Sequence, residues 1–401
     1  MAFERAFIPY GTGWSTPFVK WQGSFANLHP LKFAAQCAGL AFARGKVDPK
    51  SLDSLVLGFT VPSTQCFYGA PWVAGQIGAP DITGPMVMQA CATGARAITT
   101  AAALVEGGTN ERVLVLTADR CSNGPHLYYP DPSGPGGTGA AENWVMDNFG
   151  KDPWAGGAMI QTAENVAKEA GISRAEQDEM TLMRCAQYEE ALRDDAAFLR
   201  RFMLLPLEVN PSGKKVLATV KGDEGVFATT AAGLAALRPV LPEGTVTFGS
   251  QTHPADGNAG LIVTTREAAR DLASDKSITI RVVSFGEARV KKGFMAMAVV
   301  PAAAAALKRA GWSFADCEAI KTHNPFAVND VFFSRSTGVP AEKVNRYGSS
   351  LVFGHPQGPT GTRLVLELIE ELVLRGGGRG LFAGCAAGDS AMAVCVEVKV
   401  A

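Results

Sequence analysis

VMQACATGAR, at residues 87–96, is the stretch on which the fold interpretation depends. Its apolar first residues favour a strand, Cys91 stands at the following turn, and small residues through Leu104 favour a helix. A helix N-terminus favours the thiolate form of a cysteine through its dipole and its unpaired backbone N–H groups. Most single cysteines are buried structural residues, so this stretch alone leaves the role of Cys91 open.

The pattern of this stretch returns near the C-terminus. TGAR at 93–96 precedes a predicted helix, a glycine pair at 107–108 and an apolar strand. TGTR at 360–363 likewise precedes a helix, three glycines at 376–378 and another strand. A second pair of segments, each leading from a helix end to an Asp-containing turn, matches at nearly the same offset: 44–53 and 309–316. Two matches at one offset indicate an internal duplication of a βαβ-rich unit.

Apolar periodicity predicts further helices and strands in the first half of the chain. Helices are expected at 29–45 and 72–77, and strands at 55–59, 86–90 and 113–117. This alternation favours an α/β fold.

The composition changes between about residues 120 and 250. Gly, Pro and aromatic residues at 121–157 predict a loop excursion, and the pattern at 158–169 favours a helix. Ser173 and Glu176 form a predicted capping box that begins a helix at 174–194. The predicted organisation is therefore a first half at 1–120 and 251–277, an inserted loop domain at 121–250, and a second half at 278–401.

Composition and charge argue against several classes of protein. The 401 residues are 47% hydrophobic and include 44 glycines, which suits a large α/β enzyme with many tight turns. A formal net charge of -1 implies no broad attraction to nucleic acid or anionic membranes. No apolar run reaches transmembrane length and the first residues lack a signal-peptide layout, so a cytoplasmic protein is expected.

The cysteines and glycines match no metal or dinucleotide motif. The eight cysteines form no CxxC pair, and no His and Cys stand at zinc-like spacing, so reduced thiols and no bound metal are expected. Glycines within 134–139 formally fit GxGxxG, but they follow no predicted strand and open no predicted helix. A dinucleotide fingerprint is therefore not expected.

Three stretches of the second half carry further candidate residues. THNPFA at 322–327 contains His323, the Gly/Pro turn GHPQG at 354–358 contains His355, and GCAAG at 384–388 contains Cys385. Each lies at a predicted strand-to-turn junction, which is where doubly wound sheets place their ligands. A single histidine is more often structural, but here the stretches coincide with the repeat of the Cys91 environment.

With these residues the chain resembles the thiolase superfamily, of the acetyl-CoA acyltransferase and 3-oxoacyl-CoA thiolase type, over essentially its full length. Cys91 in ACATG resembles the acylated cysteine, GHP at 354–356 resembles the family's GHP signature, and Cys385 resembles its second cysteine. TAENVA at 162–167 resembles part of the family's loop domain.

The resemblance implies a fold, ligands and an assembly. The fold would be a duplicated five-layered α/β/α/β/α sandwich with an inserted loop domain that binds CoA. Coenzyme A would be a co-substrate, with no cofactor bound permanently, and acyl-CoA or 3-oxoacyl-CoA would be the other ligand. The assembly would be a homodimer or a homotetramer.

The chemistry of these side chains agrees with the resemblance. His355 can take the proton of Cys91, and the thiolate can attack a thioester or a 3-oxo carbonyl. Cys385 can carry a proton to and from the carbon next to a thioester. The resemblance implies two oxyanion holes, one from the backbone N–H groups of Cys91 and Ala387, the other from His355 with a donor near His323.

Several positions depart from the family pattern. HNPF at 323–326 stands where most members have NEAF, so an imidazole that titrates replaces an amide. Ala387 replaces a glycine, Phe227 replaces an arginine of the CoA-binding loop, and Ala158 replaces a histidine. These changes indicate a different or bulkier acyl group. The residues expected to contact CoA or the acyl group are Met159, Phe227, Thr252, Met295, Phe326 and Ala387.

Two other functions fit parts of this pattern. A decarboxylating ketosynthase uses one cysteine and two histidines, which Cys91, His323 and His355 could imitate. Cys385 argues against it, because a ketosynthase needs no second thiol there. A non-catalytic thiolase-like subunit that binds acyl-CoA is the other alternative, which the altered loop residues support and the complete set of reactive side chains opposes.

Overall fold

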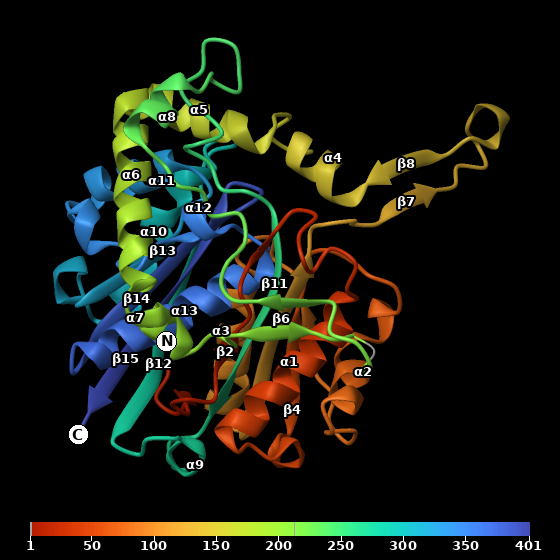
Figure 1. Ribbon diagram of the computed structural model, residues 1–401, viewed down its shortest axis with the longest axis vertical. Helices are drawn as coiled ribbons and strands as arrows, with labels where there is room; N and C mark the ends of the chain where they lie inside the picture. Colours follow the sequence, from red (N-terminus) through yellow and green to blue (C-terminus); the bar gives the residue numbers. More distant parts are fainter. Residues whose placement is uncertain (1, 212) are drawn as a thin grey trace.

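One continuous sheet runs through the protein (Figure 1). The computed structural model describes residues 2–211 and 213–401. The sheet strands are β1 Phe7–Ile8, β2 Trp14–Ser15, β3 Val19–Lys20, β4 Ser54–Gly58, β5 Met86–Val87, β6 Arg112–Arg120, β11 Ala255–Thr264, β12 Ile278–Arg289, β13 Ala319–His323, β14 Gly377–Ala386 and β15 Ser390–Val400. Within the described residues this 11-stranded sheet has the order β13-β14-β15-β12-β1-β11-β6-β4-β5, with β2 and β3 beside β11.

The strand pairing repeats in the two halves, which confirms the predicted duplication. In the first half β4 pairs parallel with β6, and β6 pairs antiparallel with β11. In the second half β13 pairs parallel with β14, and β14 pairs antiparallel with β15. The sequence did not predict how the halves join. Phe7 of β1 pairs with both β11 and β12, and a two-residue strand has no periodicity to detect.

Two helices pack against each other at the centre of the fold. They are α3 (Thr93–Glu106) and α13 (Gly358–Leu374), and α13 contacts β13 and β14 of one half as well as β6 and β11 of the other. The backbones approach closely at Gly94. A Cβ atom there would lie 2.6 Å from the backbone nitrogen of Thr362, so only glycine permits this packing.

Further helices cover the outer faces of the sheet. On the first half, α1 (Pro30–Gly45) contacts β6 and β11, and α2 (Gly69–Gln76) contacts β4. On the second half, α10 (Val299–Ala310) contacts β12, β14 and β15. The short α9 (Arg266–Leu272) follows β11, whereas α11 (Ala327–Thr337) and α12 (Ser350–Phe353) flank the end of the second half. The outer helices, the two halves of the sheet and the central helices between these halves give the expected five layers.

The insertion between the halves contains more regular structure than the sequence predicted. The expected loop at 121–157 forms a hairpin of β7 (His126–Tyr129) and β8 (Ala140–Asn143), followed by α4 (Trp144–Gly150). This hairpin projects away from the body of the protein (Figure 1). The turn-forming glycines that suggested a loop lie at its tip. The other elements are α5 Met159–Ala170, α6 Arg174–Ala191, α7 Arg193–Arg200, β9 Leu207–Val209, β10 Ala218–Val220 and α8 Ala231–Ala236.

Buried ion pairs connect the insertion to the core. Arg363 of α13 donates to both carboxylate oxygens of Asp223, at 2.6 and 2.8 Å, and also to Glu367 at 3.0 Å. All three side chains are completely buried. Arg184 of α6 pairs with Asp330 of α11 at 2.9 Å in a second buried contact. Buried charges need such partners, so the position of the insertion is tightly specified.

The remaining predicted elements agree with the structure to within a few residues. Ser173 and Glu176 make both hydrogen bonds of the capping box that begins α6. The strand expected at 86–90 is shorter, since β5 ends at Val87 and a turn leads to Cys91. Across the described residues, the helices are all too short or too polar to span a bilayer.

Candidate active site

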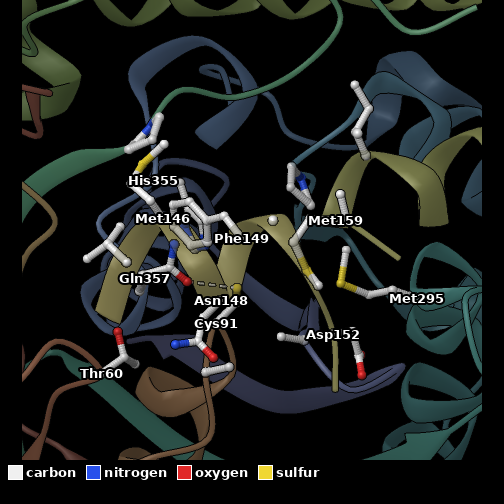
Figure 2. A pocket seen from close by; sticks show the side chains of 18 of the residues that line it. Thr60, Cys91, Met146, Asn148, Phe149, Asp152, Met159, Met295, His355 and Gln357 are labelled. Atoms are coloured by element: carbon white, nitrogen blue, oxygen red, sulfur yellow. Dashed lines mark hydrogen bonds between the residues drawn. The ribbon is translucent and has the colours of Figure 1, made fainter. Parts of the chain in front are cut away.

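Part of the predicted reactive set lines a cavity of about 820 Å³ (Figure 2), whereas His323 and Cys385 are buried outside its lining. Cys91 and His355 line it, and so do five of the six expected CoA or acyl contacts: Met159, Thr252, Met295, Phe326 and Ala387. Phe227 lies outside this lining with 71% of its side chain exposed, so its role in CoA binding stays a prediction.

Cys91 occupies a tight turn between β5 and α3. The backbone N–H groups of Ala92 and Thr93 donate to the carbonyls of Gln89 and Ala90, and the Thr93 hydroxyl accepts from the N–H of Gln89. Ala90 has a positive φ of 44°. This turn directs the sulfur of Cys91 into the cavity, where it remains partly accessible.

The thiol form of Cys91 is favoured, although a position at a helix start was expected to favour the thiolate. Burial among protein atoms raises the pKa of the thiol to about 12, although the backbone N–H groups of Ala387 and Cys91 oppose this rise. The helix does not offset burial, because α3 begins only at Thr93. The thiol proton is instead donated to Oε1 of Gln357, at 3.1 Å (Figure 2).

We expect alkylation of Cys91 by iodoacetamide in the free enzyme to accelerate continuously between about pH 7 and pH 9, because the thiolate is a minor species throughout that range. Peptide mapping by mass spectrometry would follow Cys91 separately from the accessible Cys66. A rate that levels off near neutral pH would contradict a protonated resting thiol.

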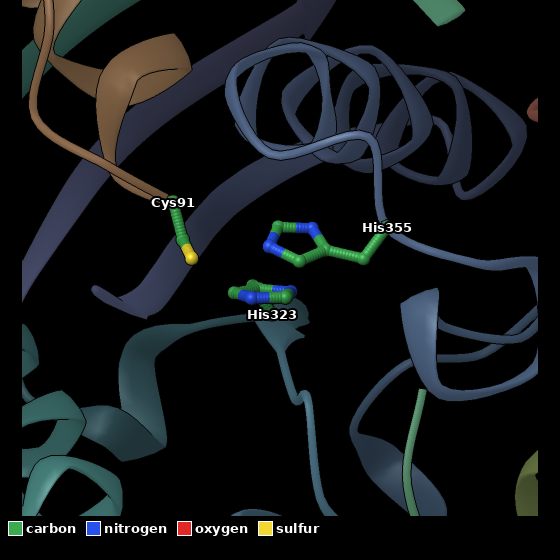
Figure 3. Close-up of side chains that lie close together, drawn as sticks. All are labelled: Cys91, His323 and His355. Atoms are coloured by element: carbon green, nitrogen blue, oxygen red, sulfur yellow. The ribbon is translucent and has the colours of Figure 1, made fainter. Parts of the chain in front are cut away.

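Two stacked histidines face the sulfur of Cys91 (Figure 3). The rings of His323 and His355 lie 4.0 Å apart between centroids, at 29°. Nδ1 of His323 lies 2.8 Å from Oγ of Ser350, and Nδ1 of His355 lies 2.7 Å from Oγ1 of Thr360. Nε2 of each ring has no protein partner. These anchored rings therefore offer two free nitrogens at the site.

Burial keeps both imidazoles neutral. It lowers the pKa of His323 to about 3. For His355, burial and the adjacent His323 together hold the pKa well below its usual value. A neutral imidazole can accept or donate at Nε2, depending on what its Nδ1 does with the neighbouring hydroxyl. The pair can therefore contain a proton acceptor and a hydrogen-bond donor at once.

The same three side chains are the ligand types that zinc prefers. Among the described residues, one ligand atom from each of Cys91, His323 and His355 lies within 4.8 Å of the others. A tetrahedral ion requires ligands that approach from divergent directions. The expectation of no bound metal therefore stays a prediction, and the same atoms also suit proton transfer and oxyanion binding.

Cys385 is completely buried near the end of β14. β13 and β14 are paired so that His323 lies opposite Gly384, which places Cys385 beside the histidines. Burial, with a further contribution from Cys91, holds the pKa of the Cys385 thiol well above its usual value. The amide nitrogen of Asn329 donates to its sulfur at 3.3 Å. This weakly acidic thiol suits proton exchange with carbon.

Three residues of the site were missed in the sequence. Oε1 of Gln357 accepts a hydrogen bond from the Cys91 thiol, and the Gln357 backbone has the unusual angles φ 62° and ψ -106°. Asp119 accepts from the backbone N–H groups of Val61 and Gly358, at 2.8 and 2.9 Å, and so connects loops of both halves. Asn329 is the third. Gln357 lies inside the GHPQG stretch and could have been noticed, whereas no local pattern marks the other two.

Comparison with known proteins identifies the family. Residues 12–267 match the family described as "Thiolase, N-terminal domain", and residues 276–398 match "Thiolase, C-terminal domain". The chain belongs to the thiolase family. This thiolase is 29% identical to an acetyl-CoA acetyltransferase of Escherichia coli K12, with 95% of this chain and 96% of the relative covered. It is 30% identical to a β-ketoadipyl-CoA thiolase of Pseudomonas knackmussii, with 95% and 96% covered.

A solved structure extends the similarity to the whole fold. The human mitochondrial 3-ketoacyl-CoA thiolase in complex with CoA superimposes with a TM-score of 0.88 at 26% identity, with 99% of each chain covered. The predicted family, fold and thiolase activity are confirmed, and this thiolase is an acyltransferase. Nothing in these comparisons favours a ketosynthase or a non-catalytic subunit.

Proposed function

We propose that this thiolase cleaves a 3-oxoacyl-CoA with free CoA, through an acyl intermediate on Cys91, and that the reverse reaction is a Claisen condensation. The observation that carries the proposal is that Cys91 and His355 line one cavity, with a ring nitrogen of His323 within 4.8 Å of both and the buried Cys385 close to Cys91. CoA is the co-substrate, in keeping with the CoA complex of the human relative.

The first step breaks the carbon chain of the substrate. Nε2 of His355 takes the proton of Cys91, and the sulfur forms a bond to the 3-oxo carbon. The bond between the second and third carbons then breaks, and its electron pair leaves as the enolate of acetyl-CoA. Cys385 donates its proton to the carbon of that enolate, so acetyl-CoA departs and Cys385 becomes a thiolate.

The second step releases the acyl group and restores the site. The Cys385 thiolate takes the thiol proton of incoming CoA, and the CoA sulfur attacks the acyl carbonyl on Cys91. The bond from this carbonyl to Cys91 breaks, and protonated His355 returns its proton to the Cys91 sulfur. Both cysteines and the imidazole end in their starting forms.

Two sets of donors can stabilise the oxyanions of these steps. The backbone N–H groups of Cys91 and Ala387 lie near the Cys91 sulfur, where the acyl carbonyl oxygen would develop charge. The Nε2 atoms of His323 and His355 would serve the enolate oxygen of acetyl-CoA. His355 becomes a hydrogen-bond donor when it takes the Cys91 proton. His323 would donate directly to the enolate oxygen.

The protein is also proposed to be a cytoplasmic homodimer or homotetramer. β5 lies at one end of the sheet order, so one edge of this strand is open to pairing. Three large apolar side chains near it are extensively exposed: Phe67, Tyr68 and Met86. Contact between copies at this edge would remove both the open edge and the exposed apolar surface from water.

The decisive experiment is intact-protein mass spectrometry after incubation with acetoacetyl-CoA and larger 3-oxoacyl-CoAs. We expect a mass increase equal to one acyl group on Cys91, and release of acetyl-CoA when free CoA is added. The matched control is Cys91→Ser, which should accumulate no thioester adduct, with Cys66→Ser expected to behave as the parent. Absence of any adduct with every substrate would overturn the catalytic assignment.

A further inference from the structure

The wall of the cavity beyond Cys91 is built mainly by the insertion. Residues 144–154, from α4 and the segment after it, contribute three large aromatic side chains: Trp144, Phe149 and Trp154. Methionines surround the same space: Met88, Met146, Met159 and Met295. Methionine is flexible, and its sulfur makes favourable contacts with aromatic rings. The wall therefore offers an apolar surface that can adapt to a bulky group.

The lining provides no cation for an acidic acyl group. Among its described residues there is no Lys or Arg, and Asp152 is the only carboxylate. Oδ1 of Asp152 is occupied, because it accepts from the N–H groups of Trp154 and Ala155 at 2.7 and 2.9 Å. Arg289 and Lys292 lie outside the lining, with their charges 6.0 and 5.5 Å from the Trp154 ring. A carboxylate buried in this cavity would lack a partner, which is costly.

Part of the aromatic wall is held rigidly in place. The indole N–H of Trp144 donates to the carbonyl of Thr60 at 2.8 Å. Val145 is buried against Val61 and Cys121, and Phe149 packs against the same cluster. α4 therefore has a defined position, and this side of the cavity exists before a ligand binds. Preformed apolar pockets favour ligands whose shape they match.

The same lining also leaves apolar surface uncovered. Trp154 is 64% exposed, and Met88 and Met146 are exposed by 60% and 51%. Each Å² of apolar surface that a ligand covers contributes about 25 cal/mol. A small acetoacetyl group would reach little of this surface, whereas a larger hydrocarbon would cover the indole and the thioethers. The volume of about 820 Å³ is enough to hold such a group together with the thiol end of CoA.

We propose that the acyl group this thiolase transfers is an uncharged, bulky hydrocarbon that carries a ring, seated between α4 and the methionines. The inference rests on the proposed thiolase reaction and names the substrate class of the same site. A ring is favoured over a straight chain because it can stack on the indole of Trp154 and contact several sulfurs together.

The test compares thiolysis of four substrates by the intact enzyme: acetoacetyl-CoA, a straight-chain 3-oxoacyl-CoA, a phenyl-bearing 3-oxoacyl-CoA and one that ends in a carboxylate. We expect kcat/KM for the phenyl-bearing substrate to exceed that for acetoacetyl-CoA by about 10–100-fold, because each additional carbon that an apolar pocket buries raises kcat/KM. The carboxylate substrate should be the poorest of the larger ones. In Trp154→Ala the ratio of phenyl-bearing to acetoacetyl activity should fall by about tenfold.

The control variant is Tyr128→Ala, which removes an exposed aromatic ring on the β7–β8 hairpin, outside the lining. Its substrate ratio should equal that of the parent. Preference for acetoacetyl-CoA, the straight chain or the carboxylate would overturn the inference, while acyl-Cys91 formation would still support the thiolase reaction. Failure of all four substrates to acylate Cys91 would overturn the proposed function itself.

Discussion

Replacement of Cys385 by alanine is expected to lower turnover in thiolysis by about 10²–10⁴-fold, the usual contribution of a positioned proton donor. Acylation of Cys91 by acetyl-CoA should continue, because its leaving group is a thiolate, which is a far weaker base than a carbanion and depends much less on a proton donor. The carbanion that leaves acetoacetyl-CoA during thiolysis is far more basic than a thiolate, so its departure depends on a proton donor. Stopped assays of turnover and intact mass of the acylated protein measure the two effects separately.

Cys395→Ala is the matched control for this prediction. Cys395 is equally buried, belongs to the same apolar cluster as Cys385 and lies on the adjacent strand β15. Burial raises its pKa to about 12, so it shares the environment of Cys385 without facing Cys91. The control variant should keep nearly full turnover. Equal loss of acylation and turnover in Cys385→Ala would show that the thiol supports the site and is not the proton carrier.

Replacement of Arg363 by methionine is expected to lower the free energy of unfolding by about 3–5 kcal/mol, since it leaves buried carboxylates without their cation. Asp223 and Glu367 both accept hydrogen bonds from this guanidinium and are fully buried. Methionine is nearly as long as arginine, so the decrease in unfolding free energy arises mainly from the lost positive charge and only slightly from lost side-chain volume. Urea unfolding followed by circular dichroism would measure the change.

A surface ion pair supplies the control for the stability prediction. Arg335 pairs with Glu176, and both side chains are partly exposed, at 44% and 34%. Arg335→Met should therefore lower stability by no more than about 1 kcal/mol. A similar loss in both variants, or a loss under 1 kcal/mol in Arg363→Met, would contradict the view that the buried cluster anchors the insertion.

Much of the fold was predictable because its signals are local. The duplicated strand order followed from two TG-containing helix starts, and the start of α6 followed from Ser173 and Glu176. The hairpin at 126–143 was hidden because its turn glycines dominate the composition of that segment. A strand was expected near the start of the chain, but the pairing of β1 was hidden because its two partners lie more than 250 residues away.

The reactive side chains of the site were predictable, but their environment was not. Cys91, His323 and Cys385 are distinctive by residue type and by their place at or just after strand ends. The predicted strand-to-turn junction at His355 is wrong, because this residue lies between α12 and α13. The preference for a protonated Cys91 depends on how completely the folded protein surrounds it, which no single stretch reveals. Asp119 likewise acquires its role only when loops from both halves meet at its carboxylate.

The paired turns that precede α3 and α13 explain why a duplicated chain contains one reaction centre. Ala90 and Gln357 stand three residues before the matching threonines, and both have positive φ. The position that corresponds to Cys91 in the second turn is Gly358. A Cβ atom there would lie 2.9 Å from a carboxylate oxygen of Asp119, so no second nucleophile fits. The two duplicated halves therefore have different roles. The first supplies the nucleophilic sulfur, and the second supplies the residues that transfer protons to and from it.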